Sequence, residues 1–344
     1  MTFHNVLWAG LALTLVGAAV GCFESAVAGI GKRAGHMRFA AMVVASVWLA
    51  IGGAHAAAGI SVLFIGNSFT YGANSPVQFY RADTVTDLNQ EGIGGVPALF
   101  ESFTTQAGLD YDVSLETRGG SGIDFHLANK LAEIGRRPWD AVVMHGHSTL
   151  DAEKPGDPAK LVATARKMAD LLRERNPKVE IFLTATWSRA DLTYQGSSPW
   201  TGKPIEAMAR EVRAAYDTAA AAAGVKAVVP VGEAWTRAMQ SGIADPNPYD
   251  GIEAGRFDLW AYDHYHASTH GYYLEALVVF GTLTGRDPRS LGEAECSGYE
   301  LGLSRHDVKA LQQVAFDQLA VSKLVTPVPA PAAPGSAQRC GRGR

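Results

Sequence analysis

Short apolar segments alternate with amphipathic segments between about residue 60 and residue 285 of the chain. The apolar segments are rich in Val, Ile and Leu on both faces, a composition typical of strands buried within a parallel sheet. The predicted strands are residues 61–66, 111–116, 141–144, 179–184 and 227–231.

The amphipathic segments have the spacing of apolar positions expected of helices that cover such a sheet. The predicted helices are residues 96–106, 123–134, 158–175, 204–223, 268–283 and 306–322. Gly108, Asn176-Pro177 and Gly224 stand where three of these helices end, as helix stop signals do. The pattern predicts a three-layer α/β/α sandwich around a five-stranded, parallel, flavodoxin-like sheet.

Two further apolar runs, residues 6–22 and 39–53, precede this pattern. The second follows basic residues and ends in Ala54-His55-Ala56, an A-x-A sequence of the type at which signal peptides are cleaved. We therefore expect a secretory signal peptide that ends at residue 56. The mature protein is then expected in the periplasm or outside the cell, without a stable membrane anchor.

Met37 lies at the start of this signal sequence, so we expect translation to begin there and residues 1–36 to be an upstream extension. Two alternatives stay open, a double-spanning membrane anchor and a lipoprotein anchor at Cys22. The rest of the chain divides into a hydrolase-like domain, a helical extension and a disordered tail rich in Pro and Ala. The expected bounds of these parts are residues 57–290, 291–324 and 325–344.

Composition narrows the possible functions. With 47% hydrophobic and 19% charged residues the chain can bury a large core, which excludes disorder throughout. The net charge is -4, and no cluster of Lys and Arg could follow a phosphate backbone, so nucleic acid is not an expected partner. Of the three widely spaced cysteines, Cys296 and Cys340 would remain after signal cleavage and could form one disulfide.

Reactive side chains are expected at the carboxyl edge of the sheet, where the ends of parallel strands meet. Ser68 follows the first strand directly, in Gly66-Asn67-Ser68-Phe69, and its hydroxyl could act as a nucleophile if a base is supplied. A serine in this position can equally be a helix N-cap or a turn residue.

A base is available in the segment before the 268–283 helix. Asp263 and His266 are three residues apart, so the carboxylate can bind Nδ1 of the imidazole and leave Nε2 free to take a proton. The alternative is that these are surface or N-capping residues. The joint occurrence of a strand-end serine and a downstream D-x-x-H sequence favours catalysis.

On these residues the chain resembles the SGNH, or GDSL-like, superfamily of serine esterases over roughly residues 60–285. Gly66-Asn67-Ser68-Phe69 stands in place of the G-D-S-L block, and Asp263-x-x-His266 is the D-x-x-H block. The resemblance implies that Ser68 is the nucleophile, His266 the general base and acid, and Asp263 the residue that orients His266. It also implies a divergent branch of the superfamily, because the first block has Asn67 where Asp is usual.

The resemblance further implies an oxyanion hole of three donors: the Ser68 amide, a glycine amide and an asparagine side chain. Gly122, in Gly119-Gly120-Ser121-Gly122, matches the glycine. Where the family has G-x-N-D, this chain has His145-Gly146-His147-Ser148, so His147 takes the position of the asparagine. An imidazole N–H can donate to an oxyanion as an amide does.

Other polar and aromatic residues near the strand ends are candidates for substrate binding. Asn67 adjoins the nucleophile, and Trp187 and Arg189 follow the fourth strand, where Trp187 or Trp200 could stack on a sugar ring and Arg189 could bind a carboxylate or hydroxyl. The polar, helix-poor connections over residues 71–95 and 242–259 could cover the site. Core or surface-loop roles are the alternatives for all of these.

Histidine clusters allow a different chemistry. His145 and His147 follow the third strand, and His264, His266 and His270 lie near the last large helix, so zinc could be held between the two groups. The absence of an H-E-x-x-H sequence speaks against it, and we expect no bound metal and no cofactor.

We therefore expect an exported carboxylic ester hydrolase with a Ser-His-Asp mechanism. By family analogy, its substrates are small-molecule or carbohydrate esters with O-acetyl or other short acyl groups. A catalytically decayed carbohydrate- or envelope-binding protein and a metal-dependent hydrolase stay open as alternatives. The acyl chain, the alcohol and the oligomeric state are not defined by the sequence.

Overall fold

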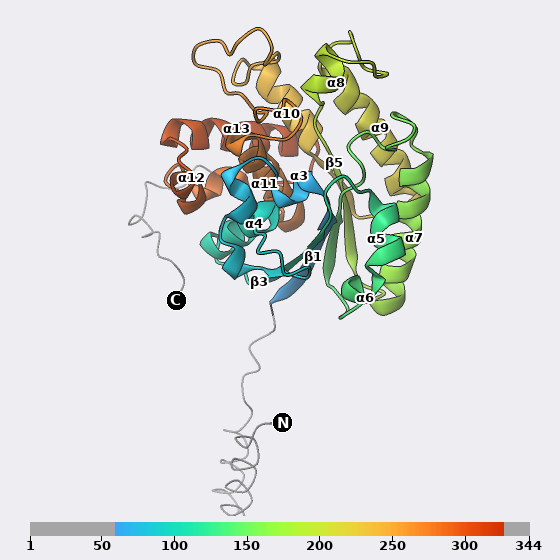
Figure 1. Cartoon of the computed structure of the whole chain (residues 1–344). Coiled ribbons are helices and arrows are strands. Elements are labelled where there is room, and N and C mark those ends of the chain that lie inside the picture. The colour runs from blue at the N-terminus through green and yellow to red at the C-terminus, as the bar shows by residue number, and fades with distance from the viewer. Residues whose placement is uncertain (1–58, 327–344) are drawn as a thin grey trace, which may run out of the picture. The chain divides into compact units, whose positions relative to one another are not determined.

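The computed structural model describes residues 59–326, which form a parallel sheet covered by helices on both faces (Figure 1). The sheet has six strands in the order β2-β3-β1-β4-β5-β6, and every neighbouring pair is parallel. Their bounds are β1 Ile60–Gly66, β2 Thr86–Asp87, β3 Tyr111–Thr117, β4 Ala141–Met144, β5 Glu180–Ala185 and β6 Ala227–Pro230. The predicted three-layer α/β/α sandwich is confirmed.

The sequence pattern predicted five of these strands, and the sheet has one more. The additional strand, β2, has two residues and pairs Thr86 with Ser114 at the edge of the sheet. It lies in the connection over residues 71–95, together with the 3-10 turns η1 (Pro76–Phe79) and η2 (Ala82–Thr84). A two-residue edge strand is too short to produce an apolar run, so its sequence carries no strand pattern.

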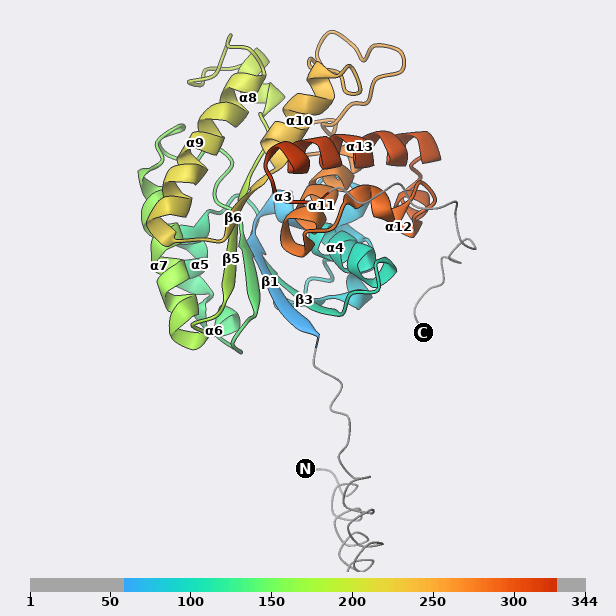
Figure 2. The ribbon, with the colours of Figure 1, turned by 180° about the vertical axis from the view of Figure 1, so that it is seen from behind.

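Successive residues of β1 point to opposite faces of the sheet and so separate two apolar cores. Val62 and Phe64 face one helical layer, and Leu63 and Ile65 face the other. The first layer consists of α4 (Gly95–Gln106), α10 (Val231–Gln240), α11 (Thr269–Thr284) and α13 (Arg305–Val321). The second consists of α5 (Ile123–Asn129), α6 (Leu131–Ile134), α7 (Ala159–Arg175) and α9 (Glu206–Ala223). Figures 1 and 2 show these layers from opposite sides.

The helices differ from the sequence predictions in several places, among them the short helices α8 (Ala190–Tyr194) and α12 (Cys296–Glu300), which were not predicted. The helix predicted over residues 123–134 is divided into α5 and α6 at Lys130, whose backbone leaves the helical conformation. The segment after β6 continues directly into α10, a helix that the apolar pattern did not predict. Gly224 ends α9 in the left-handed conformation with φ 60°, as its position in the sequence indicated.

The C-terminal part of the described chain packs on the same core as the sheet. After η3 (Pro288–Leu291) and α12 (Cys296–Glu300), apolar side chains of α13, including Val308 and Leu311, join the α4 and α11 layer. Cys296 begins α12, whereas Cys340 lies outside the described residues, so their pairing stays a prediction. The expected signal peptide, the start at Met37, Cys22 and the tail from residue 327 also lie outside. Within residues 59–326 no helix is long and apolar enough to cross a membrane.

Candidate active site

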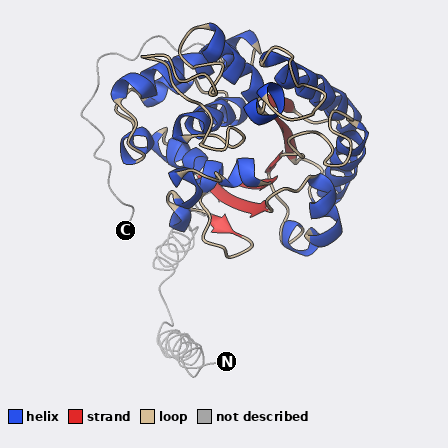
Figure 3. Ribbon diagram, turned by 45° about the horizontal axis from the view of Figure 1, so that its top comes forward, coloured by secondary structure: helices blue, strands red, loops and turns tan. Residues whose placement is uncertain are grey.

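The carboxyl ends of the strands meet at one edge of the sheet, over which the loops gather (Figure 3). There β1 ends at Gly66, and the chain turns at once into the four-residue helix α3 (Ser68–Tyr71). A side chain at position 66 would overlap the Thr70 hydroxyl, so this turn requires glycine. It places Ser68 at the first position of α3, where the residue is 5% exposed.

Asn67 holds the nucleophile turn in place. Its Oδ1 accepts a hydrogen bond from the Phe69 amide at 3.1 Å, which caps α3. Its Nδ2 donates to the carbonyl oxygens of Ser121 and Gly146, each at 2.9 Å. Asn67 is buried, and both amide hydrogens are used to tie together the loops after β1, β3 and β4. Its contact with substrate stays a prediction.

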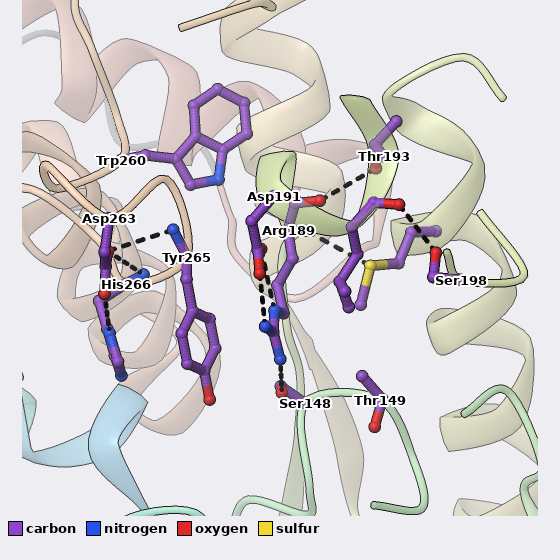
Figure 4. A network of polar contacts seen from close by, with 12 residues as sticks. Ser148, Thr149, Arg189, Asp191, Thr193, Ser198, Trp260, Asp263, Tyr265 and His266 are labelled. Carbon is purple, nitrogen blue, oxygen red and sulfur yellow. Dashed lines mark hydrogen bonds and ion pairs between the residues drawn. The ribbon is translucent and has the colours of Figure 1, made fainter. Parts of the chain in front are cut away.

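Asp263 and His266 form a hydrogen-bonded pair in the loop before α11. Asp263 Oδ2 lies 2.6 Å from His266 Nδ1, and Oδ1 accepts from the His266 amide at 3.0 Å (Figure 4). His264, between them, has φ 54°, and this tight turn brings the carboxylate back to the ring. Burial alone would raise the pKa of the Asp263 carboxyl, but the hydrogen bonds from His266 outweigh it and leave the pKa below its usual range.

The other ring nitrogen of the pair is unoccupied. His266 Nε2 is buried and has no hydrogen-bond partner within residues 59–326, and the Ser68 hydroxyl makes no hydrogen bond to it in this conformation. The ring points toward the segment that carries α3, as Figure 4 shows. Phe69, the residue after Ser68, packs edge-on against the His266 ring with 5.7 Å between centroids. The unpartnered nitrogen thus lies beside the nucleophile turn.

Two further contacts hold the chain at and after α3 against the Asp263–His266 loop and against α11. Asn74 Nδ2 donates to Asp263 Oδ2 at 2.7 Å and lies 3.3 Å from His266 Nδ1. The Tyr272 hydroxyl lies 3.2 Å from the Ser68 carbonyl oxygen and 3.1 Å from that of Ala73. Residues about 200 positions apart in the chain are joined in this way. The sequence does not single out Asn74, because nothing in its neighbourhood marks a residue whose partner lies that far along the chain.

Gly122 and His147, the predicted oxyanion donors, lie against each other. A Cβ on Gly122 would be 3.4 Å from the His147 amide nitrogen and 3.5 Å from its Cβ. The two residues line a cavity of about 210 Å³ together with charged groups, among them Arg118, Asp124 and Lys160. The loops after β3 and β4 therefore contact each other at these two residues.

Hydrogen bonding and charge favour a neutral His147 ring. Burial and the nearby Arg189 guanidinium lower the pKa of His147. Its Nδ1 lies 2.8 Å from the Thr149 hydroxyl and 3.3 Å from the Thr149 amide nitrogen. A neutral imidazole with hydrogen on Nε2 can donate to an oxyanion.

Trp187 does not line the site, contrary to its predicted role in substrate binding. The side chain is completely buried and stacks between Phe69 at 4.1 Å and Trp235 at 4.6 Å. Trp200 is also completely buried, and its Nε1 donates to Glu211. Large aromatic side chains after a strand are as suited to filling the core as to lining a cleft, and here Trp187 packs against Phe69 of the nucleophile turn.

Arg189 lies at the rim of the site, between the loops after β4 and β5 and the Asp263–His266 loop. Its guanidinium pairs with Asp191, with Nη2 2.6 Å from Oδ2, and Nη1 lies 3.3 Å from the Ser148 hydroxyl (Figure 4). The same group lies over the Tyr265 ring at 3.6 Å. These contacts hold the guanidinium in place. A substrate could reach only the part of the guanidinium that Asp191, Ser148 and Tyr265 leave uncovered, and the predicted contact stays a prediction.

The histidine clusters do not combine into a metal site. Within residues 59–326 no group of three or more His, Cys, Asp and Glu side chains could hold a metal ion. His145 is buried, and burial lowers its pKa to about 3, with His147 as a smaller cause. His270 has Asp307 on α13 as its partner instead of another histidine, with 3.2 Å between its Nε2 and the carboxylate.

Neither a family model nor a curated protein matches the sequence. Among solved structures, a DUF4886 family protein from Bacteroides uniformis has a TM-score of 0.54 at 19% identity, covering 78% of this chain and 97% of that one. A lipase/acylhydrolase from Enterococcus faecalis has a TM-score of 0.45 at 13% identity, covering 66% of this chain and 96% of that one. An acetyl xylan esterase, AlAXEase, also reaches 0.45, at 14% identity, covering 64% of this chain and 98% of that one.

Identities this low establish likeness of fold only, and the likeness to the Bacteroides uniformis protein carries that conclusion. The resemblance to SGNH-type hydrolases predicted a parallel sheet between two helical layers. The described residues have this architecture.

Proposed function

We propose that this chain is a serine hydrolase that cleaves carboxylic esters, with Ser68 as nucleophile, His266 as general base and acid, and Asp263 as the residue that orients His266. The observation that carries the proposal is the Asp263–His266 pair. Its 2.6 Å hydrogen bond uses Nδ1, the ring lies against Phe69 of the nucleophile turn, and Nε2 is buried without a hydrogen-bond partner among residues 59–326. An unpaired buried ring nitrogen costs free energy, which is consistent with a role during turnover.

In the proposed reaction Ser68 Oγ attacks the ester carbonyl carbon while His266 Nε2 takes the hydroxyl proton. The negative charge that develops on the carbonyl oxygen is stabilised by the amides of Ser68 and Gly122 and by His147 Nε2–H. His266 then gives the proton to the leaving alcohol, and a water molecule releases the acid from Ser68 by the same steps. The Ser68 hydroxyl must come within hydrogen-bond distance of His266 Nε2 before attack.

We further propose that the enzyme is exported and acts on short acyl esters, such as O-acetyl groups of carbohydrates. The 210 Å³ cavity beside Gly122 and His147 supports this, because its lining includes Arg118, Asp124 and Lys160. Charged groups and glycine backbone bind hydroxyl groups well, and the few apolar side chains of the lining, Phe125 and Ala152, cover only a short acyl group. Hydrolysis of p-nitrophenyl acetate should exceed that of the octanoate, and acetate should be released from acetylated polysaccharide.

The catalytic assignment is tested by comparing Ser68→Ala with Ser241→Ala, which removes an exposed serine hydroxyl at the end of α10. We expect Ser68→Ala to lower kcat on p-nitrophenyl acetate by about 10³-fold or more, and to abolish labelling by a fluorophosphonate. Ser241→Ala should behave as the wild type. Equal and poor labelling of the wild type and Ser68→Ala would instead favour a decayed binding protein.

A further inference from the structure

A second chain of serine, histidine and carboxylate side chains lies behind the candidate oxyanion donors. Glu116, at the end of β3, pairs with His126 Nδ1 on α5, and His126 Nε2 lies 3.2 Å from the Ser121 hydroxyl. Glu116 and His126 are completely buried, and Ser121 is 7% exposed. The proposed reaction uses none of these side chains.

Burial makes this chain of polar groups costly unless every member is hydrogen-bonded. The second oxygen of Glu116 accepts from Asn89 Nδ2 at 3.3 Å, and the same nitrogen lies 2.8 Å from the Thr117 carbonyl oxygen. Lys130 Nζ donates to Asn89 Oδ1 at 2.7 Å. The network therefore runs from the half-buried Lys130 to Ser121, with a defined partner at each step.

Ser121 is held at three atoms. Its hydroxyl donates to the Arg118 carbonyl oxygen at 2.7 Å, and its amide donates to the same oxygen at 3.3 Å. Its carbonyl oxygen accepts from Asn67, the residue before Ser68. Because the only hydroxyl hydrogen goes to Arg118, the hydroxyl receives the His126 hydrogen bond as an acceptor. Ser121 therefore holds the backbone at Arg118 and the Asn67 side chain in place, and its hydroxyl is not activated as a nucleophile.

Gly122 follows Ser121 directly and carries the amide that the proposed reaction assigns to the oxyanion hole. A glycine amide is free to rotate unless its neighbours fix it, and an oxyanion donor must be oriented before reaction. We propose that Glu116, His126 and Ser121 are positioning residues that hold the turn over residues 118–122, and with it the Gly122 amide, in the orientation for oxyanion binding. This inference rests on the proposed function.

The test compares Ser121→Ala with Ser297→Ala. Ser297 is also buried, and its hydroxyl lies 2.8 Å from that of Ser102 in the opposite helical layer. Hydrolysis of p-nitrophenyl acetate is measured, with kcat expressed per serine titrated by fluorophosphonate so that misfolded protein does not count. We expect Ser121→Ala to lower kcat about tenfold, with KM within about twofold of wild type.

The conservative variant Ser121→Thr, which keeps the hydroxyl, should restore most of kcat, and Ser297→Ala should retain it. A wild-type kcat in Ser121→Ala, or an equal loss in Ser297→Ala, would overturn the inference. So would fluorophosphonate labelling that persists in Ser68→Ala and disappears only in the double variant with Ser121→Ala, which would make Ser121 a nucleophile.

The variants Ser68→Ala and Ser121→Ala distinguish failure of the proposed function from failure of the positioning role. If Ser68→Ala is inactive while Ser121→Ala keeps the wild-type kcat, the positioning role alone fails. If Ser68→Ala keeps its activity, the proposed reaction fails and the positioning role fails with it.

Discussion

Individual side chains around His266 fix the orientation of its ring and so determine which ring nitrogen can take a proton. Asp263 binds Nδ1 and receives a hydrogen bond from Asn74 at 2.7 Å on the same oxygen. A carboxylate oxygen that accepts two hydrogen bonds is fixed in position, and it fixes the ring in turn. Asn74 also comes from the connection after α3, so one side chain couples the nucleophile turn to the base.

We predict that Asn74→Ala lowers kcat/KM on p-nitrophenyl acetate about tenfold, because a hydrogen bond to a charged carboxylate is lost and His266 gains freedom. Asn247→Ala is the matched control, since the Asn247 amide donates to Asp250 at the same 2.7 Å on an exposed loop. Steady-state kinetics of both variants provide the measurement. Equal activities in the two variants would contradict the role of Asn74.

At the scale of elements, α11 carries an acidic side chain into the core. Glu275 is completely buried, and its Oε2 has no hydrogen-bond partner within the described part of the chain. It lines a cavity of about 10 Å³ with Thr70, His145 and Thr184, directly beneath α3. Burial raises the pKa of the Glu275 carboxyl well above its usual range, so the folded protein favours the neutral acid.

This raised pKa makes stability depend on pH with a defined sign. The unfolded chain loses the Glu275 proton near pH 4.5, whereas the folded chain retains it, so the contribution of Glu275 to stability falls as the pH rises above that value. Glu275→Gln keeps the shape and cannot ionise. We predict that its free energy of unfolding equals that of the wild type at pH 4 and exceeds it increasingly between pH 5 and pH 8.

Urea denaturation at several pH values measures this difference, with Glu174→Gln on the exposed face of α7 as control. The control should differ from the wild type by the same amount at every pH. A difference between Glu275→Gln and the wild type that stays constant with pH would contradict the prediction.

At the scale of the whole molecule, the expected export signal precedes the described domain. Expressed from Met37 in a Gram-negative host, the protein should accumulate in the periplasm with a new N-terminus at Ala57. Ala56→Arg should block cleavage, because signal peptidases require a small residue there. Mass spectrometry of the periplasmic fraction identifies the terminus, and a chain that starts at Gly59 serves as the control without a signal. Mature protein that retains residues 37–56 would favour a membrane anchor.

The sequence alone was sufficient for the architecture, because burial on both faces of a strand leaves apolar runs such as residues 61–66 and 179–184. It also pointed to Ser68 and Asp263-x-x-His266, since local order places the serine after a strand and the carboxylate within reach of its histidine. These are short-range relations, and neighbouring residues in the chain suffice to predict them.

Relations between distant residues were decided only by the tertiary structure. The fold buried Trp187 beneath Phe69, used both amide hydrogens of Asn67, and brought Asn74 to Asp263 across about 190 positions. The hydrogen bond from Asn67 to the Ser121 carbonyl oxygen likewise joins residues that are distant in the chain. Local pattern sets which face of an element is apolar, but the packing of all elements decides which polar groups meet at the edge of the sheet.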